Sequence, residues 1–329
     1  NKMAKNICIL PGDGVGPEVT EEAVKVLKSL DLGFDFVYGD IGFGTYERLG
    51  TPLPDETIEK VEKADATLFG AVTTPPNIPN YSSPILKLRK HFDLYANLRQ
   101  CVNDEINMVI VRENTEGLYS GSERVEDNGD KAITEMIITR KGSERIIRFA
   151  FEFAKKKGFS KVTVVHKANV LRETCGLFRK VGLEVAEDYP EIEMQELLVD
   201  ACAMQLIKDP KQLQVIVTTN MFGDILSDEA SMLVGGLGVA YSGNIGTKKA
   251  VFESVHGSAP KYVGTHKINP TATIMAAKLM LEHLGFHKEA LRVENAVKKA
   301  IADKNVTPDL DGDLTTQQVT ESIIKNLEE

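Results

Sequence analysis

A regular alternation of short β-branched segments with segments of helical periodicity constrains the fold most. Expected strands lie at residues 6–11, 66–72, 108–111, 161–165 and 213–219, and expected helices include residues 20–30, 142–157 and 174–181. This order predicts an α/β fold with a largely parallel or mixed sheet. Residues 118–140 interrupt it, because two alternating segments flank Asn128-Gly129, a strong hairpin turn signal. We therefore expect a hairpin arm, of the kind that often contacts a partner subunit.

Composition excludes several classes of function. The 329 residues are 42% hydrophobic and 26% charged, which suffices for a large core and two lobes. A net charge of −9 without a basic block argues against nucleic acid and membrane surfaces as partners. No segment has the length of a membrane span or the pattern of a signal peptide. Cys8, Cys101, Cys175 and Cys202 have no disulfide or zinc spacing, so we expect reduced thiols and a cytoplasmic location.

The glycine-rich turn after the first expected strand does not match the dinucleotide-binding fingerprint. That fingerprint is G-x-G-x-x-G, whereas Gly12, Gly14 and Gly16 run G-x-G-x-G and Pro17 follows. We interpret the turn as a close approach of the backbone to a ligand, without assigning a dinucleotide to it.

Two aspartates follow the expected strand at residues 213–219. Gly223 offers a turn there, and Asp224 and Asp228 are four residues apart, so both carboxylates project from one face of the expected helix. Two carboxylates this close favour a bound cation. In the alternative interpretation no cation is bound: Asp224 caps the helix, and Asp228 is a solvated acid of its first turn. A metal site requires a third oxygen ligand and an anionic ligand elsewhere in the chain.

Three arginines are candidates for binding an anion. Arg89 and Arg99 are ten residues apart, and Arg112 ends the apolar segment at residues 108–111. Arginine binds carboxylates in a planar, bidentate manner. Alternatively, each of these residues is an ordinary surface arginine with a solvated charge. This interpretation suits Arg112 least, because Arg112 lies at the end of an expected strand, where ligands bind in α/β sheets.

Tyr119, Lys167 and Asp200 are the remaining candidates for catalysis. The phenol of Tyr119 is a possible general acid, although a core tyrosine is the commoner case. Lys167 follows the strand at residues 161–165, where desolvation would lower the pKa of an amine. Asp200 follows an apolar segment at an expected strand end, and could equally be a turn acid. We interpret His166 as structural.

The segment from Phe252 to Tyr262 has small residues and a proline after an expected strand. Such a loop lets a flat ligand approach, and His256 within it could stack or form a hydrogen bond.

Together these motifs resemble the β-decarboxylating dehydrogenases that act on isocitrate, homoisocitrate and 3-isopropylmalate. The resemblance runs from about Pro11 to Gly312, and its most specific parts are Asn220–Asp228 and Glu253–Pro260. It implies a two-lobed α/β fold with a mixed sheet and a hairpin arm for dimerisation. Residues 1–98 and 251–329 would form a large cofactor-binding domain, and residues 99–250 a small domain for substrate binding and dimerisation.

The resemblance also implies roles for individual residues. Ser83, Arg89, Arg99 and Arg112 would bind the substrate, a hydroxy di- or tricarboxylate. Asp224 and Asp228 would bind Mg²⁺ or Mn²⁺ with Asp200 of a second subunit, which would also supply Lys167 as the base, and Tyr119 would be the acid. The implied assembly is a homodimer with shared active sites, or a tetramer built from it. The dinucleotide would contact Asn169, Glu253, His256, Gly257, Ser258, Ala259, Lys261, Tyr262, Asn269 and Asp309.

Substrate and cofactor preferences rest on single positions. At the positions that correspond to residues 83–89, isocitrate enzymes have a motif similar to Ser-x-Asn-x-x-Leu-Arg. This chain keeps the serine as Ser83 but has Ile85 in place of the asparagine. Isoleucine cannot pair with the third carboxylate of isocitrate. The stretch from Asn80 to Ile85 is most similar to archaeal homoisocitrate dehydrogenases, whose longer substrate would place its third carboxylate elsewhere, and isopropylmalate has an apolar group that suits Ile85. We therefore expect the order homoisocitrate, isopropylmalate, isocitrate. Lys261-Tyr262 resembles NADP-dependent relatives, while Pro308 and Gly312 resemble NAD-dependent ones, and on balance we expect NADP⁺.

Two other classes of function compete with a dehydrogenase. A non-catalytic regulatory subunit would have lost site residues, but the candidate arginines, aspartates, Tyr119 and Lys167 are all present. A nucleotide-binding module without chemistry would not need three arginines for an anion.

Overall fold

The computed structural model describes residues 4–235 and 240–329, which divide into two compact units. Unit 1 comprises residues 4–92, 240–243 and 247–329, and unit 2 comprises residues 93–235 and 244–246. The boundaries expected from the sequence, at residues 98/99 and 250/251, stay predictions. The functional roles assigned above to the two parts stay predictions.

Unit 1 is built on four parallel strands in the order β2-β1-β3-β12. The strands are β1 (Asn6–Gly12), β2 (Asp35–Tyr38), β3 (Ala66–Ala71) and β12 (Ala250–Ser254). The β-branched segments expected at residues 6–11 and 66–72 are β1 and β3. Residues 7–10 and 66–71 are buried, as parallel strands covered on both faces require.

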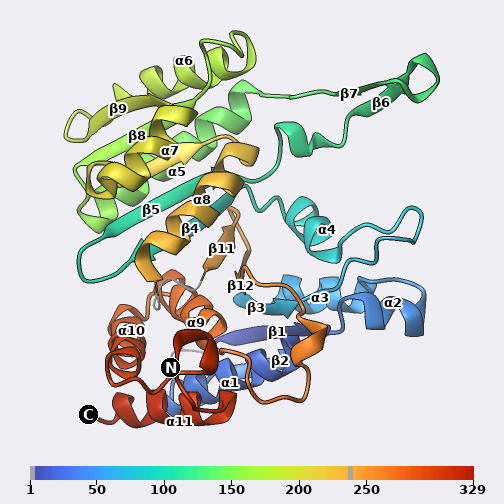
Figure 1. The fold of residues 1–329 in the computed structure, drawn as a ribbon, viewed down its shortest axis with the longest axis vertical. Helices are drawn as coiled ribbons and strands as arrows, with labels where there is room; N and C mark the ends of the chain where they lie inside the picture. Colours follow the sequence, from blue (N-terminus) through green and yellow to red (C-terminus); the bar gives the residue numbers. More distant parts are fainter. Residues whose placement is uncertain (1–3, 236–239) are drawn as a thin grey trace. The chain divides into compact units, whose positions relative to one another are not determined.

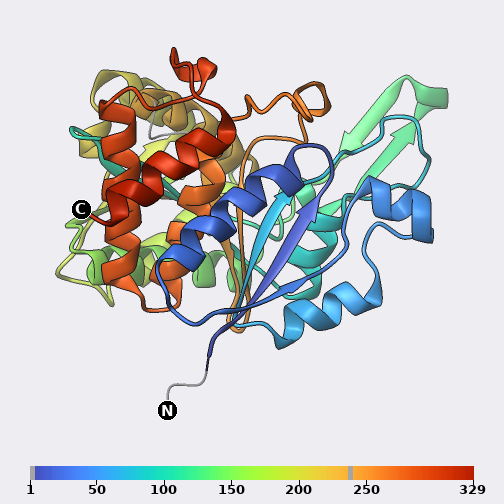
Figure 2. The same cartoon turned by 90° about the horizontal axis from the view of Figure 1, so that it is seen from below.

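Helix α9 (Thr271–His283) is the central helix of unit 1, since its first eleven residues are all buried. It packs against α1 (Gly16–Ser29), α10 (His287–Ala302), β3 and β12, which explains why most of its residues are apolar. Helix α1 also packs against β1 and β3, as the dark blue helix and the blue strands of Figure 2 show. The other helices of this unit are α2 (Phe43–Leu49), α3 (Asp55–Lys63), α4 (Pro84–His91) and α11 (Thr316–Leu327).

Unit 2 has a mixed sheet, which confirms the expected fold class (Figure 1). Strand β4 (Ala96–Val102) is antiparallel to β5 (Asn107–Glu113), and β5, β10 (Val215–Thr218), β8 (Lys161–His166) and β9 (Glu193–Leu198) follow in parallel. Strand β11 (Tyr241–Ile245) contains residues of both units.

Alternate side chains of these strands enter two separate cores. Val109 and Val111 of β5 pack with α5 (Arg140–Lys157) and α6 (Thr174–Ala186), while Met108 and Ile110 pack with α7 (Val199–Lys208) and α8 (Asn220–Val234). The period of two residues thus places one pair of helices on each face of the sheet. Helices α7 and α8 also pack against each other.

The predicted hairpin is present, and its strands extend away from the sheet of unit 2 (Figure 1). Strands β6 (Glu123–Glu126) and β7 (Lys131–Thr134) pair in antiparallel fashion around Asn128 and Gly129, which have φ of 54° and 100°. Both residue types tolerate such backbone angles, so the turn signal had a physical basis. A role of this hairpin in dimerisation stays a prediction.

All four cysteines are buried and unpaired. Burial raises the pKa of Cys8, Cys101 and Cys202 to about 12, so these thiols are unreactive. In the described part of the chain, no helix combines the length and apolar character that crossing a membrane requires.

Candidate functional site

The first turns of helix α8 carry the candidate metal ligands of unit 2. The helix begins at Asn220, directly after β10, so the prediction of a turn at Gly223 was wrong. Gly223 lies inside the helix, where an added Cβ would be 2.6 Å from Cγ of Arg112. The glycine is needed there for close approach of α8 to β5, not for its conformational freedom.

Arg112 is held against α8 by two of its residues. Its Nε donates to Oδ1 of Asn220 (2.9 Å), and its Nη1 donates to Oδ1 of Asp224 (3.1 Å). The side chain of Asn220 also donates to the backbone oxygen of Glu116 (3.0 Å), which fixes the segment that leads to Tyr119. Arg112 is only 4% exposed, so its charge requires such partners.

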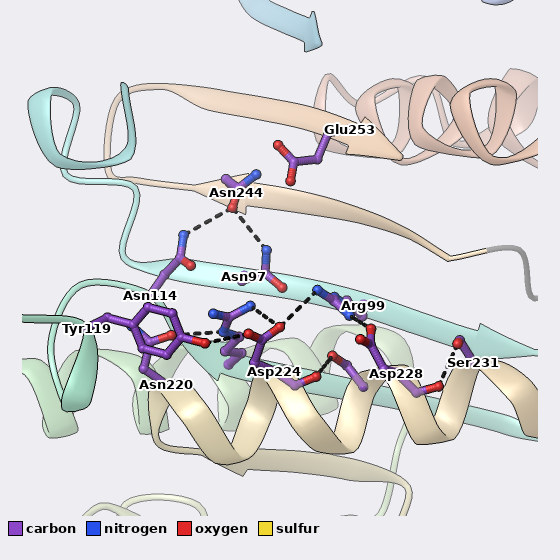
Figure 3. A network of polar contacts seen from close by, with 12 residues as sticks. Asn97, Arg99, Asn114, Tyr119, Asn220, Asp224, Asp228, Ser231, Asn244 and Glu253 are labelled. Carbon is purple, nitrogen blue, oxygen red and sulfur yellow. Dashed lines mark hydrogen bonds and ion pairs between the residues drawn. The ribbon is translucent and has the colours of Figure 1, made fainter. Parts of the chain in front are cut away.

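Arg99 on β4 reaches the same helix one turn further along (Figure 3). Its Nη1 donates to Oδ1 of Asp228 (2.9 Å), and its Nη2 lies 3.8 Å from Oδ1 of Asp224. Arg99 is also buried, whereas the side chains of Asp224 and Asp228 are 38% and 69% exposed. The arginines therefore form a buried base, and the two carboxylates are accessible above it.

Tyr119 completes this cluster from the short 3₁₀ helix η1 (Leu118–Ser120). Its hydroxyl donates to Oδ2 of Asp224 (2.5 Å), and the guanidinium of Arg112 lies 5.3 Å from the ring centroid. The ring is 45% exposed, so Tyr119 is not the core residue that the alternative interpretation assumed. The structure thus brings together Arg99, Arg112, Tyr119, Asp224 and Asp228.

Lys167 and Asp200 form a separate ion pair in unit 2, with Nζ 2.7 Å from Oδ1. Lys167 directly follows β8, and Asp200 comes two residues after the end of β9, in the first turn of α7. The hydrogen bond from Lys167 lowers the pKa of Asp200 below its usual range. Both groups are partly or largely exposed, so a ligand can reach them.

In unit 1, Arg89 on α4 binds Glu253 on β12, with Nη2 3.0 Å from Oε1. The buried polar atoms of this unit without a hydrogen-bond partner among the described residues include Nε of Arg89, Oε2 of Glu253 and Nε2 of His256. Unsatisfied buried polar atoms are costly unless a ligand pairs with them. They therefore fit a polar ligand such as a dinucleotide. Ser83 precedes α4 and is half-buried.

The other predicted dinucleotide contacts are spread over several loops. Asn269 donates to Asp309 (3.1 Å), Ser258 is buried, and Gly257, Lys261 and Tyr262 are exposed. Ala259 has a positive φ of 41°, just before the 3₁₀ helix η5 (Pro260–Tyr262). Asn169 lies in unit 2 and is exposed.

The glycine-rich turn at residues 12–16 approaches other backbone of unit 1. The backbone N–H of Val15 donates to Ser258 O (2.8 Å), and an added Cβ at Gly14 would lie 2.0 Å from that oxygen. The carboxylate of Asp13 accepts hydrogen bonds from the N–H groups of Phe43, Gly44 and Thr73. The backbone of this turn thus lies close to the segment that holds Ser258, and its approach to a ligand stays a prediction.

A divalent metal would have two ligands from α8. Within residues 4–235 and 240–329, no group of three or more His, Cys, Asp or Glu side chains is arranged to hold a metal ion. Asp224 and Asp228 nevertheless offer hard carboxylate oxygens one helical turn apart, which suits Mg²⁺ or Mn²⁺. Asp200 does not join them within one chain.

Two residues of the cluster were not assigned a role from the sequence. The sequence gives no indication of the function of Asn220, which follows from its bond to Arg112, 108 residues away. Glu113 follows Arg112 and accepts hydrogen bonds from Thr115 and Glu116. Burial raises the pKa of Glu113, although these hydrogen bonds oppose the shift.

Comparisons with known proteins agree with this geometry. Residues 6–323 match the model of the family described as isocitrate/isopropylmalate dehydrogenase. The chain is 49% identical to a 3-isopropylmalate dehydrogenase of Methanothermobacter thermautotrophicus, with 98% of each chain covered. It is also 49% identical to a homoisocitrate dehydrogenase of Methanocaldococcus jannaschii, with 97% and 96% covered. The crystal structure of isocitrate dehydrogenase from Methylococcus capsulatus is similar at a TM-score of 0.93 and 44% identity, with 99% and 100% covered.

Replacing Gly223 by alanine should destabilise the protein by about 1–3 kcal/mol, because the new methyl group overlaps the side chain of Arg112. Gly176→Ala in α6 is the matched control, since no atom lies within 4 Å of the added Cβ there. That change should be neutral or stabilising by up to about 1 kcal/mol. Chemical denaturation of both variants measures the difference, and equal effects would contradict the packing argument.

Proposed function

Because the chain belongs to the isocitrate/isopropylmalate dehydrogenase family, we propose that it catalyses metal-dependent oxidative decarboxylation of a 3-substituted malate with hydride transfer to NAD(P)⁺. The products would be a 2-oxoacid and CO₂. The observation that carries the proposal is the buried pair Arg99 and Arg112 beneath the accessible carboxylates of α8 and the phenol of Tyr119.

The arginines bind the carboxylates of the substrate in this proposal. Each guanidinium has five N–H donors in a planar fork that matches a carboxylate, and Nε of Arg99 is buried without a hydrogen-bond partner among the described residues. A malate carries two carboxylates, so a site with Arg99 and Arg112 on rigid strands can orient it. Arg89, and Ser83 at the start of α4, are proposed as further substrate contacts.

Two bound groups supply the chemistry that side chains lack. When bound, the metal at Asp224 and Asp228 supplies Lewis-acid stabilisation of negative charge, and the dinucleotide at Glu253, His256 and Asn269 accepts the hydride. The accessible carboxylates and the unsatisfied buried atoms of Glu253 and His256 support these assignments.

Lys167 and Tyr119 move the protons. Lys167 accepts the proton of the C2 hydroxyl as the hydride leaves, which gives a ketone β to a carboxylate. Loss of CO₂ then leaves an enolate, and Tyr119 donates a proton to its carbon. The exposure of the phenol and its position over Arg112 support this role.

A second copy of the chain is the proposed partner of helices α7 and α8. Met204 and Ile207 on α7 and Ile225 and Met232 on α8 are large apolar side chains that lie exposed, up to 82% for Met232. Side-by-side helices with an apolar outer face are typical of interfaces between subunits. The same helices carry Asp200, Asp224 and Asp228, so a dimer through this face could supply the third metal ligand. Four buried, unpaired thiols fit the proposed cytoplasmic location.

The preferred substrate and cofactor are proposed from single side chains. Ile85 on α4 is half-buried and next to the exposed Leu86, which gives an apolar contact for a C3 substituent and no partner for the third carboxylate of isocitrate. The longer substituent of homoisocitrate would carry its carboxylate past this apolar contact. We propose the order homoisocitrate, isopropylmalate, isocitrate. The exposed Lys261 can pair with a 2′-phosphate, which favours NADP⁺.

The purified chain alone should turn over substrate only with Mg²⁺ or Mn²⁺. Asp224→Asn and Asp228→Asn should each lower kcat at least about a hundredfold, because a metal ligand is lost. Both should stay folded because the amide oxygen still accepts from arginine, although loss of a counter-charge beside a buried arginine should lower the unfolding temperature. Asp303→Asn in unit 1 is the control and should keep full activity. A folded chain without turnover would instead indicate a regulatory subunit.

Steady-state kinetics with three substrates and both cofactors should give kcat/KM values in the order homoisocitrate, isopropylmalate, isocitrate. Ile85→Asn should improve isocitrate relative to isopropylmalate by about tenfold, because the amide can pair with the third carboxylate. Leu86→Asn is the control, because it adds the same polar amide at the neighbouring position and should not improve isocitrate. An isocitrate preference of the unmodified chain would refute the assignment.

Met232→Glu should convert a dimer to a monomer and abolish turnover, because a charge enters the apolar face. Light scattering after size-exclusion chromatography measures the mass. Leu291→Glu changes an exposed apolar residue of unit 1 and should leave mass and turnover unchanged. An active monomeric Met232→Glu variant would exclude a shared site.

A further inference from the structure

His166 is the last residue of β8 and directly precedes Lys167. Its side chain is buried at 3% exposure, and its backbone pairs with Leu198 of β9. The ring does not take part in the proposed reaction, and a buried histidine of this kind is commonly a core residue. Its hydrogen bonds indicate a more specific role.

Both ring nitrogens of His166 have a defined partner. Nδ1 lies 3.0 Å from the backbone nitrogen of Ala168, whose N–H can only donate, so Nδ1 is the acceptor and carries no hydrogen. In the neutral ring the hydrogen is therefore on Nε2, which lies 2.9 Å from Oε1 of Glu196. Arg179 holds that carboxylate with Nε at 2.5 Å from Oε1 and Nη2 at 3.1 Å from Oε2, so Glu196 stays an acceptor.

These bonds fix the peptide unit that follows Lys167. Its N–H, on Ala168, donates to the ring of His166. Its carbonyl oxygen, on Lys167, accepts from the backbone N–H groups of Val170 (3.1 Å) and Leu171 (2.8 Å). Because a peptide unit is planar, bonds at both ends fix its orientation. On the other side, pairing of His166 with β9 fixes the backbone that enters Lys167.

We propose that His166 is a positioning residue for Lys167: Nδ1 of its ring holds the N–H of Ala168 and so aims the amine, while Glu196 and Arg179 hold the ring. This rests on the proposed role of Lys167 as the base. A base that is displaced by about 1 Å loses on the order of a hundredfold in rate, so a small shift of this peptide is sufficient to affect turnover.

Two substitutions separate the functions of the two ring nitrogens. Asparagine at position 166 keeps an acceptor for the N–H two residues later, as in an Asx turn, but cannot reach Glu196. Glutamine places its amide near the position of Nε2 and can donate to Glu196, but has no acceptor at the position of Nδ1. A residue that only filled the core would tolerate glutamine better than the smaller asparagine.

The test measures kcat and KM with homoisocitrate, Mg²⁺ and NADP⁺ for His166→Asn and His166→Gln, together with thermal unfolding. We expect His166→Gln to lower kcat by about 10- to 100-fold with KM values within about threefold, and His166→Asn to keep kcat within about threefold. His287→Gln on the exposed start of α10 is the control and should match the native chain.

Equal kcat values for the two variants, or a more active His166→Gln, would overturn the positioning role. Lys167→Ala distinguishes this failure from that of the mechanism. If Lys167→Ala keeps the native kcat, Lys167 is not the base, and the role of His166 fails with it. If Lys167→Ala is inactive while His166→Gln is fully active, only the positioning role fails.

Discussion

The burial of two guanidinium groups is the interaction on which the site of unit 2 depends. Arg99 and Arg112 are on adjacent strands and almost inaccessible to solvent, so their charges need partners within the protein. Helix α8 provides those partners through Asn220, Asp224 and Asp228. The helix can come this close only because Gly223 has no side chain. The absence of a side chain at Gly223 thus allows the aspartates of α8 to reach the arginines of the sheet.

The parts of the fold that follow from local periodicity were predictable from the sequence. The period of two in β5 and β10 places alternate residues in different cores, and Asn128-Gly129 dictates a turn. The start of α8 was predicted less accurately, because a glycine near the expected start of a helix also indicates a turn. The sequence does not show that Arg112 occupies the space beside Gly223.

The candidate site was predictable as a set of residue types, but not as a set of bonds. Aspartates at a spacing of four and three arginines, one of them at a strand end, indicate anion and metal chemistry from the sequence alone. Which carboxylate each arginine meets depends on pairs more than one hundred residues apart, such as Arg112 with Asp224. The roles of Asn220 and His166 depend on similar contacts or on the direction of a hydrogen bond. Periodicity contains no such information.

The division into two units also determines the order in which the chain can fold during synthesis. Most of unit 2 is one continuous segment, residues 93–235, whereas unit 1 combines residues up to 92 with strand β12 and helices α9, α10 and α11. Helix α1 packs against both α9 and α11, so the first strands and α1 lack this cover until α11 has left the ribosome. Until then they expose apolar surface, which makes the N-terminal segment the part of the nascent chain that most needs protection from aggregation.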